Sequence, residues 1–428
     1  MSNPYKIDWN EYAALARQAV AEGCVLLKND DKALPIRKGE RVSVFGRIQF
    51  DYYKSGTGSG GAVNTRYVTN ILDALKENKD ISVNEELEQT YRDWLKDHPF
   101  EKGMGWAQEP WCQEEMPVTK ELAEQAAAKS DIAVVIIGRT AGEDKDNSAA
   151  EGSYLLTAAE HQMLKEVCGA FKRVAVLLNV GNIIDMKWVK EYDPAAVLYV
   201  WQGGQEGGAG AADILTGTVT PCGKLSDTIA LDISDYPSTE GFGDPTRVIY
   251  KEDIYVGYRY FETFAKDCVL YPFGYGLSYT NFEWSDFKAD IDKKGNVTVK
   301  VTVTNTGNYS GKDVVQVYSG GSIHLCDMPE LPTEPDKSVG ITRNAIIGAL
   351  AGAVICALII IIRDSARNTV RSQEDIQNKL QLNVIGEVSQ VPGGERFYKK
   401  SVHGDRELLI TDKACGFAFI ETYKAMRT

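Results

Sequence analysis

Three runs of small and branched apolar residues constrain the fold of this chain most strongly. They span residues 132–138, 174–181 and 196–204, and segments with helical periodicity alternate with them. A strand that is apolar on both sides is typical of a parallel sheet covered on both faces. The alternation therefore predicts an α/β fold, with a mostly parallel sheet sandwiched by helices.

Other segments are expected to complete this first domain, which we assign to residues 1–278. Thr119 and Thr157 are candidate N-caps, because a threonine hydroxyl can accept a hydrogen bond from the first helical turn. A further strand is expected at 42–46, and helices are expected at 10–29, 70–77, 119–130, 156–171 and 207–217.

The pattern changes to strict apolar–polar alternation near residue 280. Residues 296–307 alternate throughout, and a short apolar stretch follows at 313–318. Such strands are typical of an antiparallel β-sandwich with one buried face. A complete sandwich of this kind takes about 100 residues, so we expect only a partial one at 279–320.

An uncharged apolar run, AIIGALAGAVICALIIII, occupies residues 345–362 and follows a Pro-containing linker at 321–344. Its 18 residues reach the lower end of the length of a membrane-spanning helix. The alternative is a buried core helix, but such helices are seldom apolar on every face. We therefore predict one transmembrane helix, a single-pass membrane location and a juxtamembrane tail at 363–428.

The orientation in the membrane remains open. The first residues, MSNPYKIDWNEY, lack the charged and then apolar pattern of a signal peptide, which favours a cytoplasmic position for the first domain. In contrast, Arg363, Arg367 and Arg371 follow the apolar run closely, and this charge bias favours a cytoplasmic tail instead.

Charge and cysteine usage limit the expected partners. The formal net charge is −13 and no Lys/Arg-rich block occurs, so nucleic acid is not expected to bind. The eight cysteines lack the paired spacing of a zinc site, and the four histidines do not cluster. We expect free thiols, no metal site and no organic cofactor.

The strand expected at 132–138 leads into a loop with three acids. Glu143, Asp144 and Asp146 follow two glycines there. Ligands of parallel sheets bind beyond the carboxyl ends of the strands, and residues 179–182 and 201–205 follow two other buried strands with polar and aromatic side chains. On this pattern alone, a solvated loop remains the alternative to a ligand site.

A second loop contains the literal pattern GxGxxG at Gly56, Gly58 and Gly61. A dinucleotide site would need these glycines directly between a strand and a helix. Nine residues separate the strand expected at 42–46 from Gly56. A loop that allows the backbone to approach a sugar or a neighbouring domain therefore fits better.

Several stretches together resemble glycoside hydrolase family 3, over about residues 10–320. They are EGCVLLKND, KSGTGSGG, VIIGRTAGEDKD, LLNVGNIIDM, WQGGQEGGAGAADILTG, KEDIYVGYRYFETF and YPFGYGLSYTNFEW. The resemblance implies the α/β-sandwich domain of that family and part of its fibronectin type III-like domain. Their order resembles the branch in which the (β/α)8 barrel comes last.

The resemblance also implies site residues and chemistry. Glu143 corresponds to the general acid/base of a retaining β-glucosidase-like enzyme, and Lys54, Ser55 and Asp146 are candidate substrate-binding residues. A general acid needs a raised pKa, and we expect like charge on nearby carboxylates, among them Glu151, to supply it. The nucleophile of the family lies on the barrel, which this chain does not contain, so weak or absent turnover of the chain alone is expected.

The segments beyond residue 320 resemble different proteins. Residues 329–392 resemble the end of a polysaccharide chain-length determinant, and residues 406–428 resemble the start of its tyrosine kinase. Three functions stay open: a β-glycosidase completed by a barrel-bearing chain and acting on oligosaccharides or aryl β-glycosides, a membrane-held carbohydrate-binding or vestigial module, and a capsule-assembly component.

Overall fold

The computed structural model describes residues 7–143, 145–247 and 249–314, which lie in a compact unit ending at Ser319. The elements of the α/β part are α1 (Trp9–Gly23), β1 (Val25–Asn29), β2 (Arg41–Phe45), α2 (Ile71–Glu77), β3 (Ser82–Val83), α3 (Glu85–Trp94), α4 (Lys120–Ala127), β4 (Ile132–Arg139), α5 (Ala158–Ala170), β5 (Val174–Val180), α6 (Lys187–Tyr192), β6 (Ala196–Tyr199) and α7 (Gly207–Leu215). They are followed by β7 (Ile229–Ala230), α8 (Tyr258–Phe264), β8 (Val269–Tyr271), β9 (Phe282–Ile291) and β10 (Val297–Asn305).

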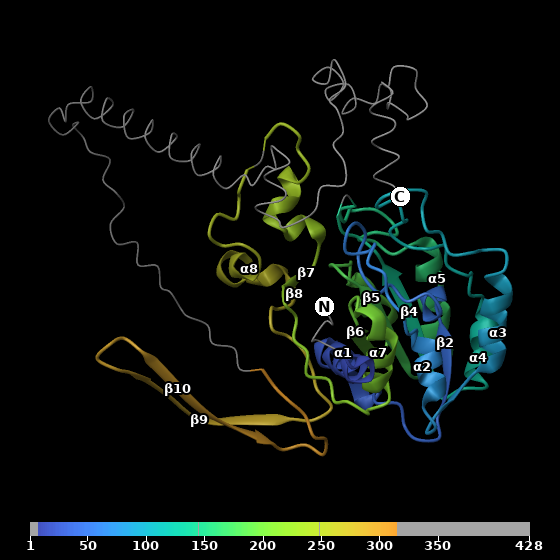
Figure 1. Ribbon diagram of the computed structural model, residues 1–428, viewed down its shortest axis with the longest axis horizontal. Coiled ribbons are helices and arrows are strands. Elements are labelled where there is room, and N and C mark those ends of the chain that lie inside the picture. Colours follow the sequence, from blue (N-terminus) through green and yellow to red (C-terminus); the bar gives the residue numbers. More distant parts are fainter. Residues whose placement is uncertain (1–6, 144, 248, 315–428) are drawn as a thin grey trace, which may run out of the picture. The chain divides into compact units, whose positions relative to one another are not determined.

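The central sheet has six strands in the order β1-β6-β5-β4-β2-β3. Strands β2 to β6 run parallel, and β1 pairs antiparallel with β6 at one edge. Apolar side chains of α3, α4, α5 and α6 join the core on one face, and those of α1, α2 and α7 join the core on the other (Figure 1). The predicted α/β fold with a mostly parallel, doubly covered sheet is confirmed.

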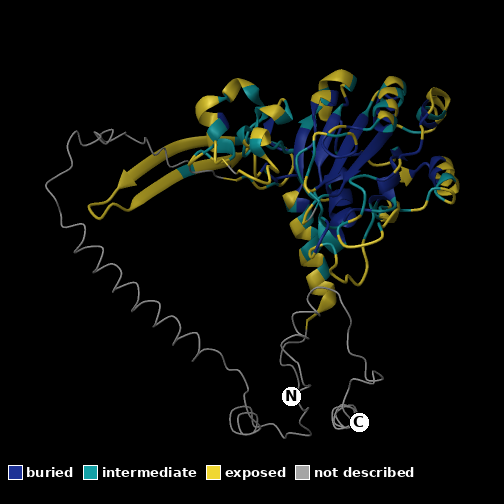
Figure 2. Ribbon diagram, turned by 90° about the horizontal axis from the view of Figure 1, so that it is seen from above, coloured by how far each residue is buried: buried dark blue, intermediate teal, exposed yellow. Residues whose placement is uncertain are grey.

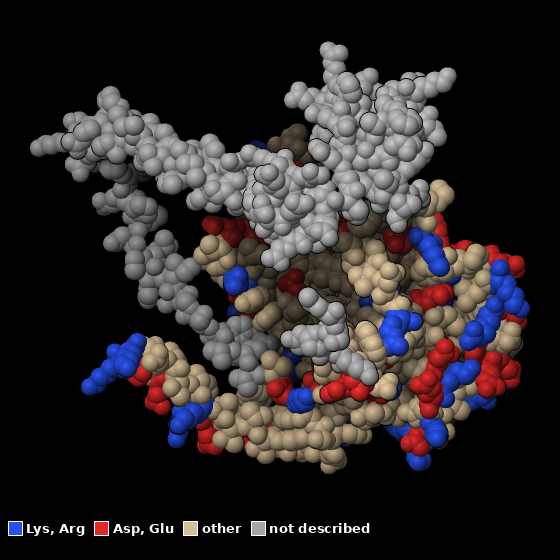
Figure 3. All heavy atoms as spheres, in the orientation of Figure 1, with Lys and Arg blue, Asp and Glu red and all other residues tan. Residues whose placement is uncertain are grey.

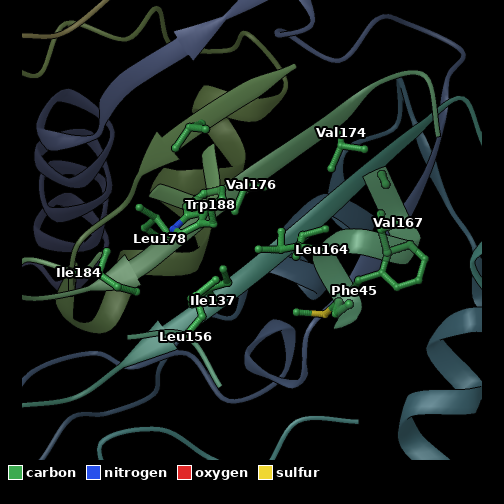
Figure 4. Close-up of a cluster of buried hydrophobic side chains, with 14 of the residues drawn as sticks. Phe45, Ile137, Leu156, Leu164, Val167, Val174, Val176, Leu178, Ile184 and Trp188 are labelled. Carbon is green, nitrogen blue, oxygen red and sulfur yellow. The ribbon is translucent and has the colours of Figure 1, made fainter. Parts of the chain in front are cut away.

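The two cores explain why the central strands are apolar throughout. Along β4, Val135 and Ile137 face the helix α5 side, whereas Val134 and Ile136 face the opposite core. Figure 4 shows Ile137 near Leu156 and Leu164 in the first core. Every residue of β4 and β5 is buried, so the strands appear dark blue in Figure 2. Burying both faces is what requires an uninterrupted apolar run.

The predicted helix caps are confirmed. The Thr119 side chain accepts a hydrogen bond from the Leu122 N–H and begins α4. Thr157 forms a capping box with Glu160 at the start of α5. These caps satisfy backbone donors that have no partner within the helix. The Thr157 cap also fixes where the chain re-enters the helical layer after the loop that contains Glu143 and Asp146, the acid loop.

The first predicted helix was too long. Helix α1 ends at Gly23, and Val25–Asn29 form the edge strand β1 instead. Cys24 already has extended backbone angles, and its side chain is fully buried. An apolar run of this length fits a helix or a strand equally well by pattern, and pairing with β6 decides the outcome here.

The alternating segment near residue 300 is a strand, as predicted. β9 and β10 form an antiparallel two-stranded sheet, but the prediction that one of its faces is buried was wrong. Nearly every residue of both strands is at least partly exposed, and the pair is yellow over most of its length in Figure 2. No second sheet within residues 249–314 covers it. The stretch predicted as a strand at 313–318 extends beyond these residues.

The prediction of a transmembrane helix is corrected. Among the helices of residues 7–314 that are described, none is both long and apolar enough to cross a membrane. Crossing a bilayer takes about 20 apolar residues, whereas α1, one of the longest, has 15 and is amphipathic. The described part of the chain is α/β, and neither the predicted single-pass location nor the membrane partner is retained. The run at 345–362, the linker, the tail and their resemblance to capsule-assembly proteins lie outside the described residues.

Candidate active site

The acid loop begins where β4 ends, at Arg139, whose side chain is 2% exposed. The Arg139 guanidinium donates to both carboxylate oxygens of Glu160, each at 2.6 Å. It also donates to the carbonyl oxygens of Ser153 at 2.9 Å and Leu155 at 3.2 Å. One buried side chain therefore ties the strand end to both the returning segment and the first turn of α5, which fixes the base of the loop.

The structure brings the loop that contains Gly56, Gly58 and Gly61, the glycine loop, next to the acid loop. The Thr57 N–H donates to the Ala141 carbonyl at 3.1 Å, and the Thr57 hydroxyl donates to the Glu143 carbonyl at 3.3 Å. The Ser59 N–H donates to the Glu143 carboxylate at 2.8 Å. Residues 84 positions apart in the chain thus form one site.

The glycines explain this close approach. A Cβ at Gly56 would lie 2.3 Å from the Ala141 carbonyl oxygen. A Cβ at Gly58 would lie 2.3 Å from the Glu143 Cβ, and the φ of Gly58 is +81°. Either substitution would push the two loops apart. The glycine pattern therefore serves the contact with the acid loop, and this agrees with setting aside the dinucleotide interpretation.

The expected direction of the Glu143 pKa shift was wrong. The Ser59 N–H, and next the Ser59 side chain, lower the pKa of the Glu143 carboxyl below its usual value. The carboxylate is exposed, so water screens the like charges that were expected to raise the pKa. In the described state Glu143 is therefore held as a carboxylate, and Asp144 lies outside the described residues.

The three predicted substrate-binding residues lie around these loops. The Lys54 ammonium donates to the carbonyl oxygens of Gly61 and Val63, both at 3.1 Å, and so closes the glycine loop. Ser55 is half-buried at the start of that loop. Asp146 is exposed in the acid loop, and its carbonyl accepts the Trp111 indole N–H at 3.0 Å. Lys54 thus already has a structural role.

Two further residues organise the site. Asn179, fully buried at the end of β5, accepts from the Tyr53 N–H at 2.8 Å and donates to the Trp201 carbonyl at 2.6 Å. The Gln202 amide donates to the Arg139 carbonyl at 3.0 Å. Both strand ends were predicted to be ligand positions. The sequence did contain a sign of a structural role for Asn179, because it is a lone Asn inside the apolar run VLLNV. The prediction did not use it.

Charged side chains of both signs are mixed on the surface of the α/β part (Figure 3). On the face shown in Figure 3, Lys and Arg side chains are interspersed with Asp and Glu side chains over the α/β part. Within residues 7–143, 145–247 and 249–314, no group of three or more His, Cys, Asp and Glu side chains is arranged to hold a metal ion. The five cysteines described there are free, and Cys24 and Cys222 are buried.

The fold and the two adjoining loops match a known family. A family model described as the glycosyl hydrolase family 3 C-terminal domain matches residues 24–279. A β-glucosidase of Ruminococcus albus is 55% identical over 313 residues, which cover 73% of this chain and 33% of that protein. This chain belongs to glycosyl hydrolase family 3, as its sequence motifs indicated.

Solved structures of β-glucosidases are also similar to this chain. A β-glucosidase from Paenibacillus barengoltzii has a TM-score of 0.69 and 55% identity, and the match covers 72% of this chain and 34% of that one. β-Glucosidase 3B from Thermotoga neapolitana in complex with glucose has a TM-score of 0.64 and 37% identity, over 71% of this chain and 43% of that one. The chain thus spans between about a third and two fifths of the length of these relatives.

Relatives with different names share this domain. An exo-α-(1→6)-L-arabinopyranosidase of Bifidobacterium longum is 32% identical over 330 residues, which cover 73% of this chain and 40% of that protein. The α/β part is therefore shared by enzymes whose names specify different sugars. The matched domain does not by itself define the sugar.

Proposed function

We propose that this chain supplies the acid/base part of a retaining, β-glucosidase-like glycoside hydrolase, with Glu143 as the acid/base. The observation that carries the proposal is the placement of one exposed carboxylate on a loop that is fixed at its base and held to a second loop at its tip. Such a group can reach a glycosidic oxygen above the sheet, yet its position is defined.

The lowered pKa of Glu143 fits one half of this cycle directly. A carboxylate is the form that activates water when the glycosyl-enzyme intermediate is hydrolysed. The first step needs the protonated form. Covering the exposed carboxylate with substrate and a barrel would remove water from it, and desolvation raises the pKa of a carboxyl group. Loss of the Ser59 hydrogen bond would act in the same direction.

Retaining hydrolysis needs a second carboxylate about 5 Å from the first. The family resemblance assigns that nucleophile to a barrel, which supports a barrel-bearing chain as a partner. We expect the 428-residue chain alone to cleave an aryl β-glucoside far below the ordinary enzymatic range of about 1–10³ per second. Lys54, Ser55 and Asp146 are the proposed contributions of this part to substrate binding. The substrate class is oligosaccharides or aryl glycosides with a β-linked sugar.

The test is a chimera in which residues 7–314 replace the matching segment of the Ruminococcus albus β-glucosidase. We expect E143Q in the chimera to lower kcat on a phenyl β-glucoside by about 10²–10⁴-fold, the usual contribution of general acid–base catalysis. The rate of the first step, in which the glycosyl-enzyme forms, should fall less with a dinitrophenyl leaving group, because that group departs without protonation.

E151Q is the matched control, because Glu151 is an exposed acid of the same segment that makes no hydrogen bond through its side chain to the described residues. Its kcat should stay within about threefold of the unsubstituted chimera, since exposed charges act weakly at a distance. If E143Q retained the full rate on phenyl β-glucoside, the role given to Glu143 would be wrong.

A further inference from the structure

A cavity of about 650 Å³ opens next to the candidate active site, beyond the carboxyl ends of β5 and β6. Its walls come from Asn182 and Trp201 at those ends, from residues 147–149 and from residues 225–242. The volume lies within the usual range of ligand pockets, about 300–1,000 Å³. Glu143 does not line it.

The wall combines aromatic rings with neutral polar groups. Tyr199, Trp201 and Tyr236 contribute rings, and Asn182 and Ser226 contribute hydrogen-bonding groups. The described residues that line the cavity include no Lys or Arg and one acid, Asp227. An anion would therefore find no counter-charge. Aromatic surface with amides and hydroxyls suits a neutral, hydroxyl-rich ligand whose ring has an apolar face.

The aromatic wall is already fixed. The Trp201 indole N–H donates to the Gly23 carbonyl at 2.9 Å, and its ring lies 4.3 Å from the Tyr199 ring, centroid to centroid. The Tyr236 hydroxyl donates to the Thr228 carbonyl at 2.9 Å. Rings held before binding cost little conformational entropy when a ligand arrives.

The backbone at Trp201 is unusual in a way that points to the same site. Its φ is +53°, a region that residues other than glycine rarely adopt and that carries strain. The Asn179 amide holds the Trp201 carbonyl in this conformation at 2.6 Å. The strained backbone thus sets the direction of the Trp201 side chain, which lines the cavity.

Free hydrogen-bonding groups remain for a ligand. Asn182, Ser226 and Ser238 have no side-chain hydrogen bond to any residue in the described part of the chain. In contrast, the Asn147 amide is engaged, since it donates to the Ile183 carbonyl at 3.1 Å. The unengaged groups lie on strand ends and on the 225–242 segment, so they face a ligand from two sides of the cavity.

We propose that this cavity is a binding site for a neutral pyranose or short β-glucoside, separate from the acid/base loop. Stacking on Trp201 and hydrogen bonds to Asn182 and Ser226 give the affinity, and the lack of a cation together with Asp227 excludes phosphorylated or carboxylated sugars. The site goes beyond the proposed catalytic function and does not depend on it, because binding here needs neither Glu143 nor a barrel.

The experiment titrates the purified 428-residue chain with glucose, cellobiose and glucose 6-phosphate, by calorimetry and tryptophan fluorescence. We expect saturable binding of a neutral sugar and none of the phosphate ester. W201A should weaken binding by at least about tenfold, as for other aromatic anchors of binding sites, and N182A by about three- to tenfold. W284A, a change on the exposed strand β9, should leave the affinity unchanged, and E143Q tests whether the sugar binds at the acid loop instead.

Thermal unfolding of each variant checks folding. If W201A unfolds, W201F keeps a stacking face without the indole N–H and should retain measurable binding that N182A weakens. The proposal is overturned if no neutral sugar binds, if W201F and N182A bind as tightly as the unsubstituted chain, or if E143Q abolishes binding. Loss of binding in E143Q would place the sugar at the acid loop. The catalytic proposal would be unaffected by that result, because the chimera tests it separately.

Discussion

At the scale of single residues, the position of Glu143 could be predicted from the sequence, but the direction of its pKa shift could not. Its position at a strand end and its family motif were readable, and the structure places it beside the glycine loop. The direction of the Glu143 pKa shift could not be predicted in this way. The sequence shows neighbouring acids, but it cannot show a backbone N–H from Ser59, 84 residues earlier.

Glu115 provides a residue-scale prediction. Burial raises the pKa of Glu115 to about 8, although the N–H groups of Arg47 and Met116 donate to its carboxylate and oppose the shift. The folded state therefore holds a proton that the unfolded chain, with a pKa near 4.3, releases. This contribution to stability is complete below about pH 4.3 and is lost as the pH rises through about 8.

We expect E115Q to remove this part of the pH dependence, because glutamine stays neutral. Denaturant unfolding at several pH values between about 4.5 and 8 measures it, and each pKa unit corresponds to about 1.4 kcal/mol. E114Q is the control, since the neighbouring Glu114 carboxylate is 67% exposed beside His98. Equal slopes for E115Q and the unsubstituted chain would show that burial does not shift this group.

At the scale of elements, long apolar runs were predictable and short ones were not. β4 and β5 are buried on both faces, so their whole length is marked by composition. β1 has five residues directly after a helix, and only its pairing with β6 separates it from that helix. β9 and β10 alternate as a half-buried pair should, yet alternation cannot say what covers the apolar side.

The junction between β4 and α5 gives the element-scale prediction. Arg139 and Glu160 are 2% and 7% exposed by side chain, and their bidentate contact joins the strand end to the helix start. E160Q should lower the free energy of unfolding by about 3–5 kcal/mol, because it leaves the Arg139 charge buried without its partner.

The control for that junction is E124Q on α4. The Glu124 carboxylate is 58% exposed and lies 3.7 Å from Lys120, so its loss should change the free energy of unfolding by at most about 1 kcal/mol. Denaturant unfolding compares the two. A similar small change for E160Q would mean that the buried pair does not secure the base of the acid loop.

At the scale of the whole molecule, the family was readable over most of the described chain, and the match to residues 24–279 confirms it. Many ordered motifs carried that conclusion. The membrane assignment rested on one apolar run and is corrected, since composition alone does not establish a membrane span and no described helix is suitable. The lining of the cavity at β5 and β6 was only partly predicted from the sequence. The strand ends were expected to bind ligands, but residues 225–242, which also line the cavity, were not.

The central claim is that Glu143 delivers and removes the proton, and one measurement tests it most directly. The chimera carrying E143A is given a dinitrophenyl β-glucoside with and without azide, and the products are identified. A retaining enzyme without its acid/base accumulates a glycosyl-enzyme that a small anion can attack without a base. We predict that azide accelerates turnover and yields β-glucosyl azide. Glucose as the sole product, at an undiminished rate that azide does not change, would contradict the claim.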